Sequence, residues 1–161
     1  MTGGAAVDDG FDARFVGLHR AAFRAAYKVL GDRAEAEDLA QEALARALVR
    51  WPRVVAYADA WVGRVAVNLA LDRVRRDRRA LLEATERGIE DPCAAERLDL
   101  VQALRGLPRR QRDVVVLRYL LDHSEQDVAG ALGVSVGSVK THASRGLAAL
   151  RTALTELEVD A

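Results

Sequence analysis

The stretch Ser124–Arg151 reads SEQDVAGALGVSVGSVKTHASRGLAALR and carries the signals of two helices separated by a tight turn. Ser124 followed by Asp127 is typical of a capped helix start. Gly133 suits the left-handed conformation that ends a helix, and Ser135 then caps the second helix. Two helices joined by a short glycine turn match the helix-turn-helix design, whose second helix enters the major groove of DNA.

The second predicted helix has two unlike faces, because α-helical residues follow one another at about 100°. Its apolar face gathers Val136, Val139, Ala143, Leu147, Leu150 and Leu154. The opposite face and one flank carry Ser138, Lys140, Thr141, Ser144 and Arg145. No acid lies between Ser135 and Arg151, and short hydroxyl side chains with cations suit contacts to phosphates and base edges. We predict a DNA-binding face here, although a basic helix face can also be merely solvated.

Length and composition narrow the class of protein. The 161 residues allow one domain or two very small ones, and 24 basic and 24 acidic residues cancel, so only the distribution of charge is informative. Cys93 is the single cysteine, which excludes an internal disulfide and a cysteine-rich zinc site. We recognise neither a signal peptide nor an apolar run near the ~20 residues that span a bilayer. We therefore expect a soluble, cytoplasmic protein without membrane insertion.

Helical periodicity recurs along the chain, while strand signals are almost absent. We predict helices from Phe11 to Leu30, from near Asp32 to Trp51, and from Asp59 to Arg79, with a short loop before the third. The acidic segment after Arg79 loses its periodicity until Leu98. The predicted fold is all-α: two small helical domains, residues 11–79 and 98–154, are joined by a flexible linker over residues 80–97, and the second is a helix-turn-helix domain.

Charge in the first half is sorted into blocks. The second helix begins with an acidic block of Asp32, Glu35, Glu37, Asp38 and Glu42, opposed only by Arg33. Acids stabilise a helix N-terminus, but a face of this kind could also bind a basic protein surface. The third helix carries a basic edge, which suits the helix C-terminus and could equally guide nucleic acid. Trp61 of the same helix lies on its apolar stripe, which favours a core position over a position that stacks on a base.

Three ordered motifs carry a family resemblance. They are GDRAEAEDLAQEALARAL (31–48), AWVGRVAVNLALDRVRR (60–76) and LRGLPRRQRDVVVLRYLLDHSEQDVAGALGVSVGSVKTHASRGLAALR (104–151). Together they resemble the sigma-70 family of bacterial RNA polymerase initiation factors, in the two-domain layout of the extracytoplasmic-function group. The resemblance implies that the first domain binds the polymerase clamp and the promoter −10 element. It implies that the second binds the −35 element and the polymerase flap.

The resemblance also implies roles for particular residues. Contact with the polymerase clamp falls on Asp38, Leu39, Gln41 and Glu42. Recognition and melting of the −10 element fall on Arg64, Asn68, Asp72, Arg73 and Arg76, and the segment 51–58 would capture a flipped base. Recognition of the −35 element falls on Ser138, Lys140, Thr141, Ser144 and Arg145. His142 and Ala143 depart from the Arg-Leu pair expected after the VKT motif, which bears on −35 specificity.

Two other function classes compete with an initiation factor. The VKTH motif is also similar to LuxR-type regulators, so a helix-turn-helix regulator with a helical sensor domain is the alternative. An enzyme is not expected, because His19, His123 and His142 are scattered and show no triad or metal-ligand spacing. We expect no cofactor and no metal. The implied partners are core RNA polymerase and promoter DNA, with an anti-sigma factor as a further candidate.

Overall fold

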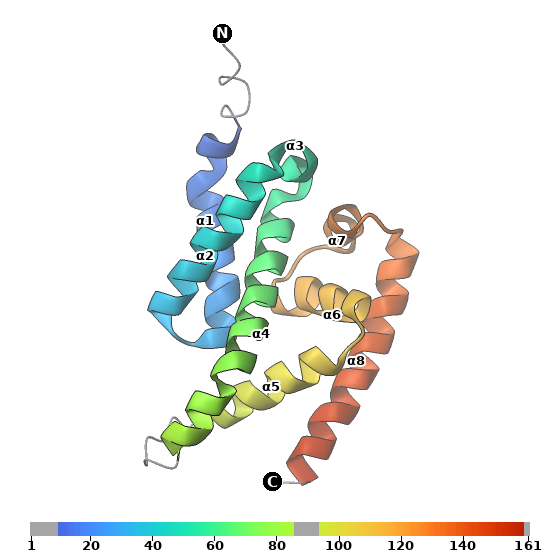
Figure 1. The fold of residues 1–161 in the computed structure, drawn as a ribbon. Helices are drawn as coiled ribbons and strands as arrows, with labels where there is room; N and C mark the ends of the chain where they lie inside the picture. The colour runs from blue at the N-terminus through green and yellow to red at the C-terminus, as the bar shows by residue number, and fades with distance from the viewer. Residues whose placement is uncertain (1–9, 86–93, 160–161) are drawn as a thin grey trace.

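The computed structural model describes residues 10–85 and 94–159, and this part of the chain is helical with no strand. The prediction of an all-α fold with two helical domains is confirmed. Figure 1 shows the helices of the first domain beside those of the second, with α4 between the two groups.

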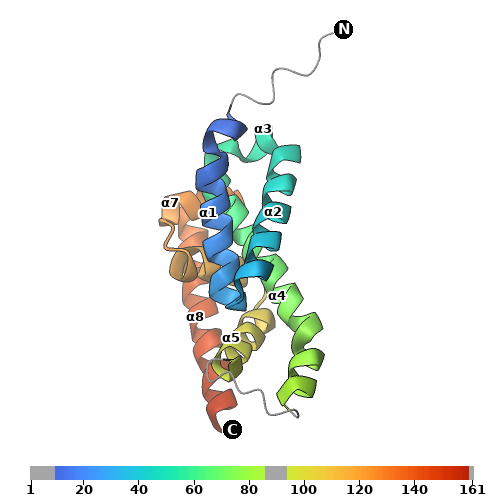
Figure 2. The same ribbon diagram turned by 90° about the vertical axis from the view of Figure 1, so that its left-hand side faces the viewer.

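Three helices form the first domain: α1 (Phe11–Leu30), α2 (Arg33–Val49) and α4 (Ala58–Thr85). Leu18 of α1, Leu39 of α2 and Val62 of α4 are buried among many alanines, and these small residues let the helices approach closely. Figure 2 shows α1 and α2 side by side. Helical periodicity predicts that Phe15 and Leu48 face the core with the apolar stripes of their helices, but they are 43% and 41% exposed.

The connection between α2 and α4 is helical, where a loop was predicted. Helix α2 ends before Trp51, but the chain enters the short α3 (Trp51–Val54) and a 3₁₀ turn, η1 (Val55–Tyr57). Proline is tolerated in the first turn of a helix because its missing N–H has no partner there, so the Trp51-Pro52 pair can open a helix. The Trp51 ring packs edge-on against Phe11 at 5.2 Å, which anchors this connection to α1.

Helical structure reaches into both ends of the predicted linker. Helix α4 continues to Thr85, and α5 (Ala94–Gly106) begins before the predicted second domain. The predicted flexibility concerns residues between these helices that lie outside the described ranges. By length and composition alone, the segment Trp51–Asp77 could cross a membrane, although the sequence analysis recognised no such apolar run. However, 56% of its most apolar window is buried inside the fold. That burial is typical of the core helix of a soluble protein.

The second domain continues with α6 (Arg109–Val115), η2 (Val116–Leu120), α7 (Glu125–Leu132) and α8 (Val136–Val159). The predicted caps are present: the Ser124 hydroxyl accepts a hydrogen bond from the Asp127 amide at 3.1 Å, and the Ser135 hydroxyl accepts one from the Ser138 amide at 3.1 Å. Gly133 has a φ of 65°, which glycine adopts without strain. The helix-turn-helix prediction is confirmed.

One turn between α6 and α7 is wider than an α-helical turn. In η2, a π-helical segment, the Leu121 amide donates to the Val116 carbonyl at 3.0 Å, five residues back. Asp122 then adopts a φ of 56°, and the His123 amide donates to the Leu117 carbonyl at 2.9 Å. This turn therefore sets the direction in which the chain leaves α6 for α7.

The two domains pack against each other. Helix α4 contacts α5, η2 and α7, and η1 contacts α7. Val101, Leu104 and Val116 of the second domain belong to the same buried cluster as the core of the first. A smaller cluster around Val128 and Val139 holds the helix-turn-helix together.

Candidate nucleic-acid and polymerase interfaces

The acidic surface predicted to bind polymerase lies on α2. Asp38, Gln41 and Glu42 are exposed, and the Glu42 carboxylate accepts a hydrogen bond from Arg46 one turn later at 2.5 Å. Leu39 is only 3% exposed and packs in the core. The surface available to a partner therefore consists of Asp38, Gln41 and Glu42, with Leu39 holding the helix in place.

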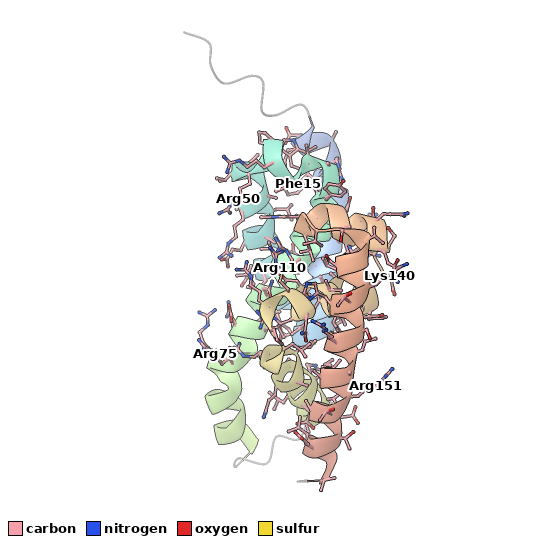
Figure 3. All side chains as sticks on the ribbon, turned by 90° about the vertical axis from the view of Figure 1, so that its right-hand side faces the viewer. Phe15, Arg50, Arg75, Arg110, Lys140 and Arg151 are labelled. Atoms are coloured by element: carbon pink, nitrogen blue, oxygen red, sulfur yellow. The ribbon has the colours of Figure 1, made fainter. Side chains whose placement is uncertain are left out.

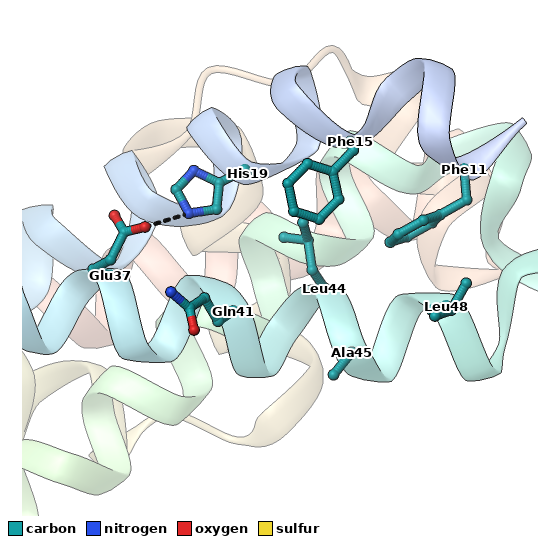
Figure 4. A pocket seen from close by; sticks show the side chains of 8 residues that line it. All are labelled: Phe11, Phe15, His19, Glu37, Gln41, Leu44, Ala45 and Leu48. Atoms are coloured by element: carbon teal, nitrogen blue, oxygen red, sulfur yellow. Dashed lines mark ion pairs between the residues drawn. The ribbon is translucent and has the colours of Figure 1, made fainter.

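A groove of about 530 Å³ runs beside this surface, between α1 and α2. Figure 4 shows Phe11, Phe15 and His19 on α1 facing the side chains of α2 across it. The His19 imidazole and the Glu37 carboxylate close one part of the groove at 2.8 Å between Nε2 and Oε1. Gln41 belongs both to the groove and to the acidic surface, so the two form one continuous region.

The residues implied in −10 recognition share one helix. Arg64, Asn68, Asp72 and Arg76 recur every four residues of α4, a spacing that places them on one face. Arg73 stands beside this face and is partly buried. The Arg76 Nε donates to the Asp72 carbonyl at 3.4 Å.

This face of α4 is turned toward the second domain. The Arg64 guanidinium lies 3.4 Å from a carboxylate oxygen of Asp113 on α6, and the Asn68 amide nitrogen lies 3.5 Å from the other. Arg105 of α5 donates to the Leu71 carbonyl at 3.0 Å and lies 3.3 Å from the Asp72 carboxylate. Three of the five predicted −10 residues thus contact the second domain.

A cleft of about 650 Å³ lies between α2, α4, α5 and α6. Its lining includes Arg46, Arg50, Arg64, Arg105, Arg109 and Arg112. Trp61 also lines the cleft; it is half-buried and packs against the hydrophobic core, in line with the predicted apolar stripe. The arginines of the stretch 105–112 therefore face the first domain, except Arg110, which donates to the Leu132 carbonyl at 3.2 Å.

The residues implied in −35 recognition lie at the start of α8. Lys140, Thr141, Ser144 and Arg145 are exposed, and Ser138 is half-buried with its hydroxyl 2.9 Å from that of Ser135. Lys140 projects away from the rest of the molecule (Figure 3), although its ammonium also lies 3.8 Å from the Glu125 carboxylate. The predicted division of the helix, with Val139 and Ala143 inward and the polar face outward, is present.

Asp113, which contacts Arg64 and Asn68 of the first domain, is a residue that the sequence interpretation missed. It is 2% exposed, and no other charged residue within the described ranges is buried to this degree. The signal available in the sequence was an acid directly before the apolar run Val114–Leu117, in phase with the buried side of a helix. Elsewhere in the described residues, no group of three or more His, Cys, Asp or Glu side chains is placed to hold a metal ion.

The fold and these surfaces define a two-domain DNA-binding protein. Sigma-70 region 2 matches residues 15–80, and Sigma-70, region 4, matches residues 97–150. The RNA polymerase sigma-E factor of Streptomyces coelicolor is 38% identical over 150 residues, which span 88% of this chain and 84% of that protein. The ECF RNA polymerase sigma factor SigW of Bacillus subtilis is 33% identical over 156 residues, spanning 84% of this chain and 83% of the relative.

Two solved structures share the fold. The sigma factor RpoE, in complex with the anti-sigma factor NepR from Bartonella quintana, is 22% identical with a TM-score of 0.54, covering 90% of this chain and 96% of that one. CnrH, in complex with the cytosolic domain of CnrY, is 21% identical with a TM-score of 0.56, covering 94% and 89%.

The chain belongs to the sigma-70 family of RNA polymerase sigma factors, in the extracytoplasmic-function group. It directs promoter recognition by RNA polymerase and transcription initiation, and it is not an enzyme. The match to region 2 over residues 15–80 removes the alternative of a LuxR-type regulator, because a sensor domain would occupy those residues.

Proposed function

We propose that three separate surfaces perform the steps of initiation in this chain. The exposed acids of α2 bind core polymerase, the Arg64–Arg76 face of α4 binds the −10 element, and the polar face of α8 binds the −35 element. We further propose residues 11–79 and 98–154 as the units that carry these contacts, with 80–97 connecting them.

Polymerase binding is proposed for Asp38, Gln41 and Glu42 together with the adjacent groove. Exposed carboxylates favour a basic partner surface and speed its association. The groove adds exposed apolar area at Phe15 and Leu48, which a partner helix would cover. An acidic rim around an apolar groove suits an amphipathic helix with a basic edge.

The main support for DNA binding is the polar face of α8. This face is exposed, includes Lys140 and Arg145, and contains no acidic residue. Such a face at the second helix of a helix-turn-helix can lie in the major groove and contact phosphates and base edges. On α4, the cations and the amide of Asn68 would bind the −10 strand. Strand opening would draw on the energy of binding unpaired bases, which offsets the few kcal/mol lost by unstacking.

We also propose an anti-sigma partner and a cytoplasmic location. RpoE, which has this fold, was solved with the anti-sigma factor NepR, and this supports a partner of the same kind here. The cytoplasm is where a bacterial protein meets RNA polymerase and promoter DNA.

The test is run-off transcription with purified core polymerase and a pool of genomic promoter fragments. Specific start sites that require this protein are expected, and the promoters recovered define the −10 and −35 sequences. A matched pair of variants assigns the α8 surface: Arg145→Ala should reduce specific starts, while Arg151→Ala, also exposed on α8, should not. Absence of specific start sites with the wild-type protein would refute the proposal that these three surfaces bind polymerase, the −10 element and the −35 element.

A further inference from the structure

The cleft between α2, α4, α5 and α6 carries more positive charge than its acids balance. Its volume of about 650 Å³ lies within the range of about 300–1,000 Å³ that is usual for small-molecule sites. Six arginine side chains line it: Arg46, Arg50, Arg64, Arg105, Arg109 and Arg112. Of these, only Arg64 belongs to the residues assigned to the −10 element. The −10 assignment therefore does not account for the charge of the cleft.

Half of the cleft arginines have a carboxylate partner. The pairs, with their nitrogen–oxygen distances, are Arg46–Glu42 (2.5 Å), Arg64–Asp113 (3.4 Å) and Arg105–Asp72 (3.3 Å). The side chains of Arg50, Arg109 and Arg112 make no hydrogen bond or ion pair with any other residue within 10–85 and 94–159. Six guanidiniums less three carboxylates leave three positive charges. A cleft lined by one sign of charge concentrates counterions of the other sign.

The protein partners also leave cleft guanidiniums incompletely satisfied. The Nε atoms of Arg64 and Arg112 are buried and have no hydrogen-bond partner among the residues that the structure describes. The distance of 3.4 Å from Arg64 to Asp113 exceeds the about 2.7–2.9 Å of a strong charge-assisted hydrogen bond. A guanidinium carries several N–H donors in a fixed fork. Donors therefore remain for an additional anion, which a small rotation of each guanidinium would bring into reach.

The placement of the cations favours an anion that contains several linked phosphates. Arg50 follows the end of α2, whereas Arg109 and Arg112 lie one turn apart on α6. A guanidinium binds phosphate oxygens through two parallel hydrogen bonds. A single phosphate presents its oxygens to one place, whereas a phosphate chain presents them to guanidiniums of both segments. Trp61 and its apolar neighbours Val65 and Leu69 form another part of the lining, where a nucleobase could pack.

We propose that this cleft is a binding site for an oligophosphate, a chain of two or more phosphates that is either free or part of a nucleotide. The phosphates lie among Arg50, Arg109 and Arg112, and the base of a nucleotide packs on the side of Trp61. Region 2 supplies Arg50, and region 4 supplies the two arginines of α6, so the bound ligand links the two regions. This site goes beyond the proposed function and depends on none of its three surface assignments.

The experiment is isothermal titration calorimetry with the full chain, at constant ionic strength and without divalent cations. The probes are sodium tripolyphosphate, ATP, adenosine and sulfate. We expect tripolyphosphate and ATP to bind at one site, and sulfate and adenosine to bind at least about tenfold more weakly, because each lacks the phosphate chain. ATP binding tighter than tripolyphosphate identifies a nucleotide as the ligand, and equal or weaker binding identifies a free chain. Sulfate or adenosine binding as tightly as tripolyphosphate, or no binding of either oligophosphate, would overturn the proposal.

Variants of the cleft locate the site. Arg50 and Arg109 are exposed, so replacing either by Ala should leave the fold intact, as circular dichroism would verify. Each replacement should weaken tripolyphosphate binding about tenfold, since each removes hydrogen bonds to a charged group. Arg20→Ala is the matched control, because Arg20 is an exposed arginine on α1, which does not line the cleft, and its affinity should stay near wild type. Equal affinities for the control and both cleft variants would place the ligand elsewhere and refute the site.

Thermal unfolding supplies a second readout. A ligand that binds only the folded protein raises the unfolding midpoint. Tripolyphosphate should therefore raise the midpoint of wild type and of Arg20→Ala, but not that of a protein with both Arg50→Ala and Arg109→Ala. A short DNA single strand tests the competing explanation: if Arg50 and Arg109 govern its binding while tripolyphosphate and ATP do not bind, the cleft serves DNA and the proposal is wrong. Failed run-off transcription with intact tripolyphosphate binding would contradict only the proposed function.

Discussion

Replacing Arg145 by Ala tests the α8 surface most directly. Arg145 is exposed and makes no hydrogen bond or ion pair with another residue in the described ranges, so the free energy of unfolding should change by no more than about 0.5 kcal/mol. Loss of a two-point contact to a base should cost about 1–3 kcal/mol of binding free energy. At about 1.4 kcal/mol per tenfold, the dissociation constant for the −35 duplex should rise about 5- to 150-fold.

The assay is fluorescence anisotropy with the full chain, the −35 duplex and single-base-pair variants of it, at several salt concentrations. A base contact relaxes specificity at one position, whereas a phosphate contact weakens all duplexes equally and lowers the salt slope by about one. Arg151→Ala is the matched control, because Arg151 is exposed on the same helix and about 9 Å further along it at 1.5 Å per residue. Equal losses for the two variants, or no loss at any salt concentration, would refute the assignment of Arg145.

Three further predictions concern α2, the core and the packing of α8. Reversing the charges of Asp38 and Glu42 to Lys should abolish copurification with core polymerase while circular dichroism stays unchanged; retained copurification would contradict the α2 assignment. Leu39→Ala should lower the free energy of unfolding in urea by about 2–5 kcal/mol, because Leu39 is buried; a wild-type midpoint would show that it packs loosely. Gly146→Ala should cost about 1–3 kcal/mol in the same assay, since its methyl group would lie 2.7 Å from buried Val115, and an unchanged stability would mean that α8 shifts freely on α6.

Local features of the fold were predictable because their causes are local. Caps such as Ser124 and turn residues such as Gly133 act within four residues, so the sequence is sufficient to place the helix-turn-helix. Periodicity located the main helices for the same reason. It misjudged Phe15 and Leu48, because periodicity identifies an apolar stripe but does not say whether another element covers it. It also missed α3, because the Trp51-Pro52 pair, which was expected to lead into a loop, begins a short helix.

The contact between the domains could not be predicted in this way. Asp113 meets Arg64, 49 residues earlier in the chain, and no spacing rule connects positions so far apart. The same holds for Tyr57 and Gly130, since a glycine inside a helix does not reveal which side chain lies on it. The resemblance supplied the residues of the −10 surface, but only the packing shows that Arg64, Asn68 and Asp72 contact region 4.

The wide turn at Val116–Leu120 makes the number of residues here as important as their identity. An α-helix advances about 100° and 1.5 Å per residue, so removing one residue from this turn would restore ordinary helical bonding and rotate everything downstream by about 100°. Region 4 would then keep its helices, with normal circular dichroism, but present α8 in a different direction and lose −35 binding in the holoenzyme. The length of this segment is therefore constrained in addition to its buried side chains, Val116 and Leu117.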